Sequence, residues 1–138
     1  MNPAYRPLKL LAFAIIASAF MAWQLHGDKP ELVNWPHDFD AAQARSHAGG
    51  GPVLAYFTAT WCGPCQKMKA TTFTDSRVEH ALDKFSIVKI DLDQQKDLAM
   101  KYHAEAIPMF AILDNDGNVK KETSGYMTAD EFLAWLNS

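Results

Sequence analysis

The chain has 138 residues, which is enough for one compact domain with a short extension. Hydrophobic residues make up 49% and charged residues 21%, a globular composition that excludes wholesale disorder. The net charge of −3 leaves no surplus of Lys and Arg to neutralise phosphates, so we expect no nucleic acid among the partners. Two cysteines are too few for a disulfide-rich scaffold or a four-cysteine zinc site.

The first 26 residues differ from the rest of the chain. Their only fully charged side chains are Arg6 and Lys9, whereas residues 27–138 carry eleven basic and sixteen acidic side chains. From Leu10 to Trp23 the only polar residue is Ser18. As a helix this run would be about 21 Å long, which is short of the roughly 30 Å hydrocarbon core.

Residues 1–26 are therefore predicted to form an apolar helix that serves as a signal anchor or a signal peptide. The small residues Ala17-Ser18-Ala19 suit cleavage, but the apolar run continues past them to Trp23, which favours an uncleaved anchor. As an anchor, the chain would sit in the inner membrane through residues 8–25. Because the positive charges precede the apolar run, both interpretations export the body to the periplasm.

The body is predicted to begin with a linker at residues 27–37, which hold Pro30 and Pro36 without a clear hydrophobic period. Asp38, Asp75 and Thr128 with Glu131 are expected to cap helices, and Asp116-Gly117 to form a two-residue hairpin turn. The predicted elements are, in chain order, a helix at 39–47, a strand at 52–58, a helix at 62–71, a helix to about 84, a strand at 85–92, a helix at 94–103, strands at 109–113 and 118–124, and a closing helix.

This order of elements predicts an α/β domain over residues 38–138. Its centre would be a mixed sheet of about four strands flanked by helices, with parallel pairing early and an antiparallel hairpin at the end.

The two cysteines, Cys62 and Cys65, stand three positions apart where a buried strand meets a helix. Unpaired backbone N–H groups at a helix N-terminus stabilise an anion, so Cys62 should have a lowered pKa and act as a nucleophile. Cys65 lies one turn further along and would resolve the mixed disulfide. Pro64 is tolerated there because the first helical turn needs no N–H donor.

The sequence argues against two other uses of the pair. A zinc site lacks partner cysteines, and the five histidines show no ligand spacing. A purely structural disulfide would close so small a loop that it stabilises little. Redox chemistry through the dithiol is favoured, and it requires no organic cofactor or metal.

The run Trp61-Cys62-Gly63-Pro64-Cys65 resembles the thioredoxin active site, and the order of elements around it agrees. The resemblance covers roughly residues 38–138. It implies a thioredoxin fold in which a cis Ile107-Pro108 bond faces the cysteines. Substrate docking would then involve Trp61, Gly63, Pro64, Ile107 and Pro108. The residues Phe57 to Cys62, Lys67-Met68 and Thr72-Phe73 are similar to the periplasmic C-terminal domain of thiol:disulfide interchange proteins of the DsbD type.

One position departs from the family pattern. Thioredoxins carry a buried aspartate six residues before the first cysteine, and this chain has Tyr56 there. A phenol with a reference pKa of about 10 is a poor base near neutrality. Lys89 matches the buried lysine of the family without its usual carboxylate partner. Tyr56 and Lys89 are therefore either a modified proton-transfer environment for Cys65 or simple packing residues of the sheet.

The sequence thus predicts an exported, membrane-anchored thiol:disulfide oxidoreductase that reduces protein disulfides through Cys62 and Cys65. Gly63-Pro64 and Ile107 resemble reductant members of the family, and a membrane thiol-transfer protein would supply electrons. Two alternatives stay open. One is a disulfide-forming or isomerising enzyme, and the other is a non-catalytic module that binds a client.

Overall fold

The structure is a computed structural model, and it describes residues 15–18, 21 and 30–138. Of the predicted apolar helix, residues 15–18 and 21 are helical, and the remainder of that segment lies outside the described residues. Among the residues described, no helix combines the length and apolar content needed to cross a membrane.

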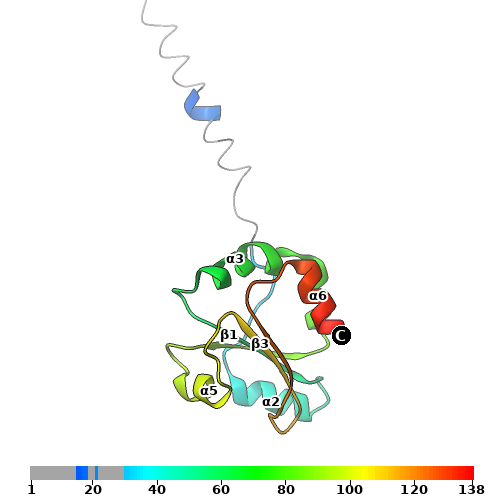
Figure 1. Cartoon of the computed structure of the whole chain (residues 1–138). Helices are drawn as coiled ribbons and strands as arrows, with labels where there is room; N and C mark the ends of the chain where they lie inside the picture. Colours follow the sequence, from blue (N-terminus) through cyan, green and yellow to red (C-terminus); the bar gives the residue numbers. More distant parts are fainter. Residues whose placement is uncertain (1–14, 19–20, 22–29) are drawn as a thin grey trace, which may run out of the picture.

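The body alternates helices and strands around one sheet (Figure 1). Its elements are α2 (Phe39–His47), β1 (Val53–Thr58), α3 (Gly63–Thr71), the 3₁₀ turn η2 (Thr72–Thr74), α4 (Ser76–Leu82), β2 (Ser86–Asp91), α5 (Lys96–Lys101), β3 (Met109–Leu113), β4 (Val119–Ser124) and α6 (Ala129–Asn137). The strand order is β2-β1-β3-β4, with β1 parallel to β2 and antiparallel to β3. The predicted α/β fold with a mixed four-stranded sheet is confirmed.

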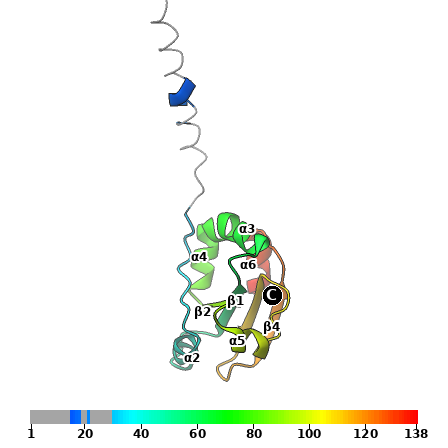
Figure 2. The same ribbon diagram turned by 90° about the vertical axis from the view of Figure 1, so that its left-hand side faces the viewer.

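Helices cover both faces of the sheet, and the central strand β1 is therefore buried on both faces. Val53, Ala55 and Phe57 belong to the hydrophobic cluster on the α2 and α5 side. Leu54 and Tyr56, which alternate with them, belong to the cluster beneath α3, α4 and α6. Figures 1 and 2 show these two helical layers on opposite sides of the sheet.

Local capping signals in the sequence place the helix starts correctly. The Asp38 carboxylate accepts a hydrogen bond from Ala41 N at 2.9 Å, and the Asp75 carboxylate accepts one from Arg77 N at 2.9 Å. Thr128 and Glu131 form the predicted capping box of α6. These helices begin where a side chain satisfies an otherwise unpaired N–H group.

The connection between β3 and β4 differs from the prediction. A two-residue turn at Asp116-Gly117 is wrong, because residues 114–118 all lie between the strands. The Asp114 carboxylate accepts hydrogen bonds from the backbone N–H groups of Asp116 and Asn118, and this holds the wider turn. Gly117 lies at its end with a φ of 81°, a conformation that favours glycine.

Residues 30–37, within the stretch expected to be a linker, pack against the domain. Figure 2 shows this segment running beside α4 to the start of α2. Val33 and Trp35 are only 6% and 4% exposed, and they join the cluster beneath α3 and α4. The segment is fastened by hydrogen bonds from Leu32 N to Phe73 O at 2.9 Å and from Lys89 N to Pro36 O at 2.7 Å.

Candidate active site

Cys62 and Cys65 are joined by a disulfide bond at the start of α3, with their Cα atoms 5.3 Å apart. Cys62 is the N-cap of the helix, and its sulfur accepts a hydrogen bond from Cys65 N at 3.2 Å. This is the place where the helix presents unpaired N–H groups and its positive end. The structure therefore directs a helix terminus at the Cys62 sulfur, as the sequence predicts.

The residues next to Cys62 form an exposed rim. Trp61 is 67% exposed, and Gly63 and Pro64 are exposed as well. The Trp61 indole N–H donates to the Asp93 carboxylate at 3.0 Å, which fixes the ring against the loop that follows β2. A Cβ atom added at Gly63 would meet nothing within 4 Å, so the surface over this residue is open.

The loop before β3 lies against the cysteines. Ile107-Pro108 is a cis peptide bond, and half-buried Ile107 packs on the small cluster of Ala59, Cys62 and Cys65. Pro108 is buried, and its carbonyl accepts a hydrogen bond from Gly125 N at 2.8 Å. The structure thus brings the predicted docking loop to the disulfide from a distant part of the chain.

A cavity of about 270 Å³ lies on the other side of the pair and reaches Cys65. Besides α3 and the residues just before it, the segment 30–37, β1 and β2 contribute lining residues. The lining residues that bear titratable or charged groups are Glu31, His37, Tyr56, Cys65, Lys69, Lys89 and Asp91. Tyr56 and Lys89 are direct neighbours in the parallel β1–β2 register.

Tyr56 packs as part of an aromatic cluster. Its ring stacks on Phe110 with centroids 4.8 Å apart and meets Trp35 at 5.1 Å. Burial raises the pKa of Tyr56 to about 12, and the nearby charge of Glu31 acts in the same direction. The phenol therefore keeps its proton at neutral pH.

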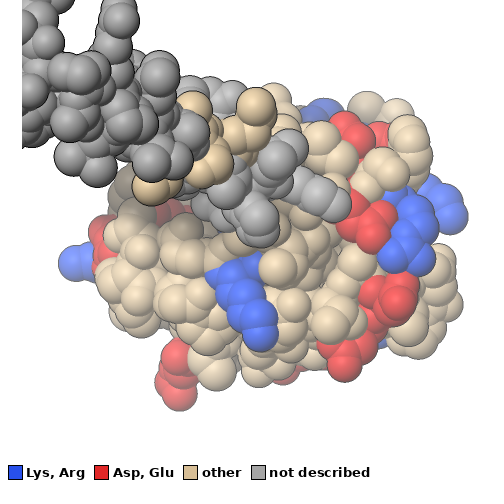
Figure 3. Space-filling model, turned by 90° about the horizontal axis from the view of Figure 1, so that it is seen from above, with Lys and Arg blue, Asp and Glu red and all other residues tan. Residues whose placement is uncertain are grey.

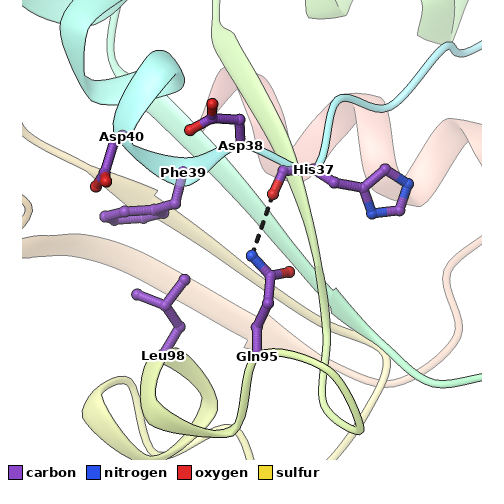
Figure 4. Close-up of a pocket in the computed structure, with 6 residues that line it drawn as sticks. All are labelled: His37, Asp38, Phe39, Asp40, Gln95 and Leu98. Carbon is purple, nitrogen blue, oxygen red and sulfur yellow. Dashed lines mark hydrogen bonds between the residues drawn. The ribbon is translucent and has the colours of Figure 1, made fainter.

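Other hollows and charges lie away from the disulfide. A shallower pocket of about 670 Å³ lies between the start of α2 and α5, and there the Gln95 side chain donates to His37 O at 3.1 Å (Figure 4). Figure 3 shows Lys and Arg on the visible face beside Asp and Glu rather than gathered into one basic patch. Within the described part of the chain, no group of three or more His, Cys, Asp or Glu residues is placed to hold a metal ion.

Sequence reasoning missed Glu31, an acidic residue that lines the cavity of about 270 Å³ beside Cys65. Glu31 was not singled out, because its position depends on contacts between residues 30–37 and distant parts of the domain. A signal for those contacts was present in the alternation of Leu32, Val33, Asn34 and Trp35, of which only Val33 and Trp35 are buried. Asp93, which accepts the hydrogen bond from Trp61, was not singled out either.

The family model for the thioredoxin-like domain matches residues 39–138. The chain belongs to this family. The match covers every element from α2 to α6 and includes both cysteines. It confirms the resemblance that the Trp61 to Cys65 motif indicates.

Among curated relatives, the chloroplastic thioredoxin Y1 of Arabidopsis thaliana is 40% identical over 82 residues, which are 59% of this chain and 46% of the relative. The thiol:disulfide interchange protein DsbD of Haemophilus ducreyi is 32% identical over 94 residues, 64% of this chain and 16% of DsbD. The chain thus spans about half or less of the length of these two relatives.

Among solved structures, the C-terminal domain of DsbD from Neisseria meningitidis, in its oxidised form, superposes with a TM-score of 0.62 at 25% identity. The superposition covers 75% of this chain and 97% of that domain. Family, fold and the cysteine pair together support a thiol:disulfide oxidoreductase.

Proposed function

We propose that this chain is a thiol:disulfide oxidoreductase that reduces disulfide bonds of protein substrates through Cys62 and Cys65. The observation that carries the proposal is the disulfide at the N-terminus of α3, whose first sulfur accepts a backbone N–H of the helix. A thiol at such a position is acidic and nucleophilic, and a second thiol one turn away completes an exchange couple.

The reaction proceeds in two exchange steps. The Cys62 thiolate attacks one sulfur of the substrate disulfide, forms a mixed disulfide and releases the other substrate sulfur as a thiolate that takes a proton from solvent. Cys65 then loses its proton and attacks Cys62, so the Cys62–Cys65 bond forms and the second substrate thiolate leaves. Two electrons have passed from the dithiol to the substrate.

The substrate docks on the rim around Cys62 in this proposal. Trp61 supplies an exposed aromatic surface, and the loop that packs on the cysteines supplies backbone groups. The docking residues are Trp61, Gly63, Pro64, Ile107 and Pro108. Tyr56 and Lys89 belong to the environment of Cys65 on the opposite side.

We also propose that residues 1–26 export the domain at 38–138 to the periplasm and hold it at the inner membrane through residues 8–25. The support is the charge and apolar pattern of the sequence and the similarity to DsbD proteins. A membrane thiol-transfer protein would then return electrons to the Cys62–Cys65 disulfide. Fusing residues 1–37 to a phosphatase that is active only outside the cytoplasm tests export, which an inactive fusion would refute.

A redox titration of the full chain against dithiothreitol tests the direction of exchange. We expect a potential closer to the roughly −270 mV of thioredoxin than to the roughly −120 mV of the oxidant DsbA. A value near that of DsbA would instead support a disulfide-forming enzyme. Failure of the pair to equilibrate with small thiols, together with stable client complexes, would support a binding module.

A further inference from the structure

The second cysteine has to lose a proton inside the protein before it can resolve a mixed disulfide. Cys65 is 2% exposed, so bulk water does not reach its sulfur freely. The cavity beside it is the route by which that proton can leave. At about 270 Å³, this cavity has room for water between Cys65 and the groups on its walls.

Few of those groups can accept a proton at neutral pH. Tyr56 is already protonated because burial raises its pKa to about 12. Lys69 and Lys89 line the cavity as well, and the lysine ammonium group is a hydrogen-bond donor without an acceptor. His37 is an exposed residue of the lining. The Asp91 carboxylate accepts a hydrogen bond from Asp93 N at 2.9 Å, which engages it in the turn after β2.

Glu31 is the remaining carboxylate of the cavity. Its side chain is 19% exposed, and Oε2 lies 3.7 Å from Nζ of Lys69 on α3, the helix that carries Cys65. Glu31 lines this cavity together with Tyr56 and Cys65, and its charge contributes to the raised pKa of Tyr56. Glu31 and the buried Cys65 are thus lining residues of the same cavity.

The fold holds the backbone segment that carries this carboxylate in place. Leu32, the next residue, bonds to Phe73 O, and the other end of the segment is held where Gln95 bonds to His37 O (Figure 4). Between these points Trp35 packs on Tyr56 and Phe73 at 5.1 and 5.3 Å. The segment is thus a fixed wall of the cavity.

We propose that Glu31 accepts the thiol proton of Cys65, through water in the cavity, when Cys65 attacks the mixed disulfide on Cys62. The Cys65–Cys62 bond forms, the bond from Cys62 to the substrate sulfur breaks, and the departing thiolate carries the electron pair. Glu31 afterwards releases the proton to solvent or to that thiolate. The step rests on the dithiol exchange proposed above and holds for either direction of net transfer.

A stopped-flow reaction of the reduced chain with excess dithiobis(nitrobenzoic acid), an aryl disulfide, separates the reaction rates of the two cysteines. The first coloured thiolate is released by Cys62 at a rate that depends on reagent concentration. The second is released when Cys65 attacks the adduct on Cys62, at a rate that does not depend on reagent concentration. For Glu31→Gln we expect an unchanged first phase and a second phase slowed at least about tenfold at pH 7, a loss on the scale of general-base catalysis. The deficit should shrink above about pH 9, where a free thiol ionises by itself.

Three controls interpret the result. Glu122→Gln makes the same change on the exposed face of β4 and should alter neither phase. Lys69→Gln removes the ion pair but keeps the carboxylate, and it should slow the second phase far less than Glu31→Gln. Asp91→Asn removes the other acid of the cavity and should also have the smaller effect.

An unchanged second phase in Glu31→Gln, an equal slowing of both phases, or a larger effect of Asp91→Asn would each overturn the role of Glu31. Absence of both phases in the unaltered chain would instead refute the proposed exchange itself. Thermal unfolding of each variant identifies any loss that comes from misfolding, and a folded Glu31→Asp variant should recover part of the second phase.

Discussion

The two sulfurs of the disulfide are almost equally buried, yet their surroundings differ. Cys62 caps α3 and is bordered by the exposed residues Trp61, Gly63 and Pro64. Cys65 lies over a cavity with acidic, basic and phenolic walls. The comparison shows that burial alone does not assign their roles. The outer side is suited to meeting a substrate, and the inner side is suited to moving a proton.

The largest expected effects come from replacing the sulfurs one at a time. Cys62→Ser should abolish exchange, because the nucleophile at the helix terminus is lost. Cys65→Ser should keep the first attack and accumulate a mixed disulfide. Mass spectrometry after reaction with a disulfide-bonded peptide measures both outcomes. Accumulation of the adduct in Cys62→Ser, rather than in Cys65→Ser, would reverse the assignment of the two sides.

A pair of tryptophan substitutions compares the segment 30–37, on the side of Cys65, with the exposed residues around Cys62. Trp35→Ala removes a buried ring and should lower the free energy of unfolding by about 3–5 kcal/mol. Trp61→Ala removes an exposed ring and should change it by about 0.5 kcal/mol or less. Urea unfolding of both variants measures the difference. Equal losses would contradict the packing of residues 30–37 on the domain.

The dependence of stability on alkaline pH measures the burial of the Tyr56 phenol. Because the pKa of Tyr56 is raised from 10.0 to about 12, the unfolded chain releases this proton first. The protonated phenol therefore contributes to the free energy of unfolding. This contribution is fully present below about pH 10 and falls by at most about 3 kcal/mol as the pH approaches 12. Tyr56→Phe should lack this component of the fall, whereas Tyr126→Phe, which removes a half-buried phenol, should retain it. Identical curves for Tyr56→Phe and the unaltered chain would contradict the burial of the phenol.

The smallest effect concerns α6, which contributes neither cysteine nor a lining residue of the cavity. Hydrogen bonds from the Thr128 backbone N–H and hydroxyl lower the pKa of Glu131. This stabilisation is present above the ordinary carboxyl pKa and is lost as the pH falls through the lowered value. Glu131→Gln should therefore reduce the melting temperature slightly at pH 7, less at pH 3, and leave exchange rates unchanged. A changed exchange rate would show that the site is not independent of α6.

Sequence reasoning succeeded where the signal is local. Helix Phe39–His47 and strand Met109–Leu113 have the predicted bounds, because a capping aspartate and a short apolar run mark them. The helix after β2 is shorter than predicted, since α5 ends at Lys101. The predicted two-residue turn at Asp116-Gly117 was wrong, because the Asp114 side chain accepts hydrogen bonds from two backbone N–H groups and so stabilises a wider turn.

For the site, the outer side was accessible to sequence reasoning and the inner side only in part. The cysteines, Trp61 and Ile107-Pro108 lie in recognisable motifs, and the structure brings them together. Glu31 reaches the cavity only because Val33 and Trp35 bind the segment to distant residues of the domain. The alternation at residues 32–35 indicates that this segment is half-buried, but it does not indicate which distant residues the segment contacts.

The most direct test of the account is the ionisation of Cys62 in the reduced chain. The rate of alkylation by iodoacetamide, followed from pH 4 to pH 10 in Cys65→Ser, gives the pKa of this thiol. We expect a value at least about one unit below the roughly 8.5 of a free cysteine, because the N-terminus of α3 stabilises the thiolate. A value of 8.5 or above would show that the helix terminus does not activate Cys62 and would contradict the central claim.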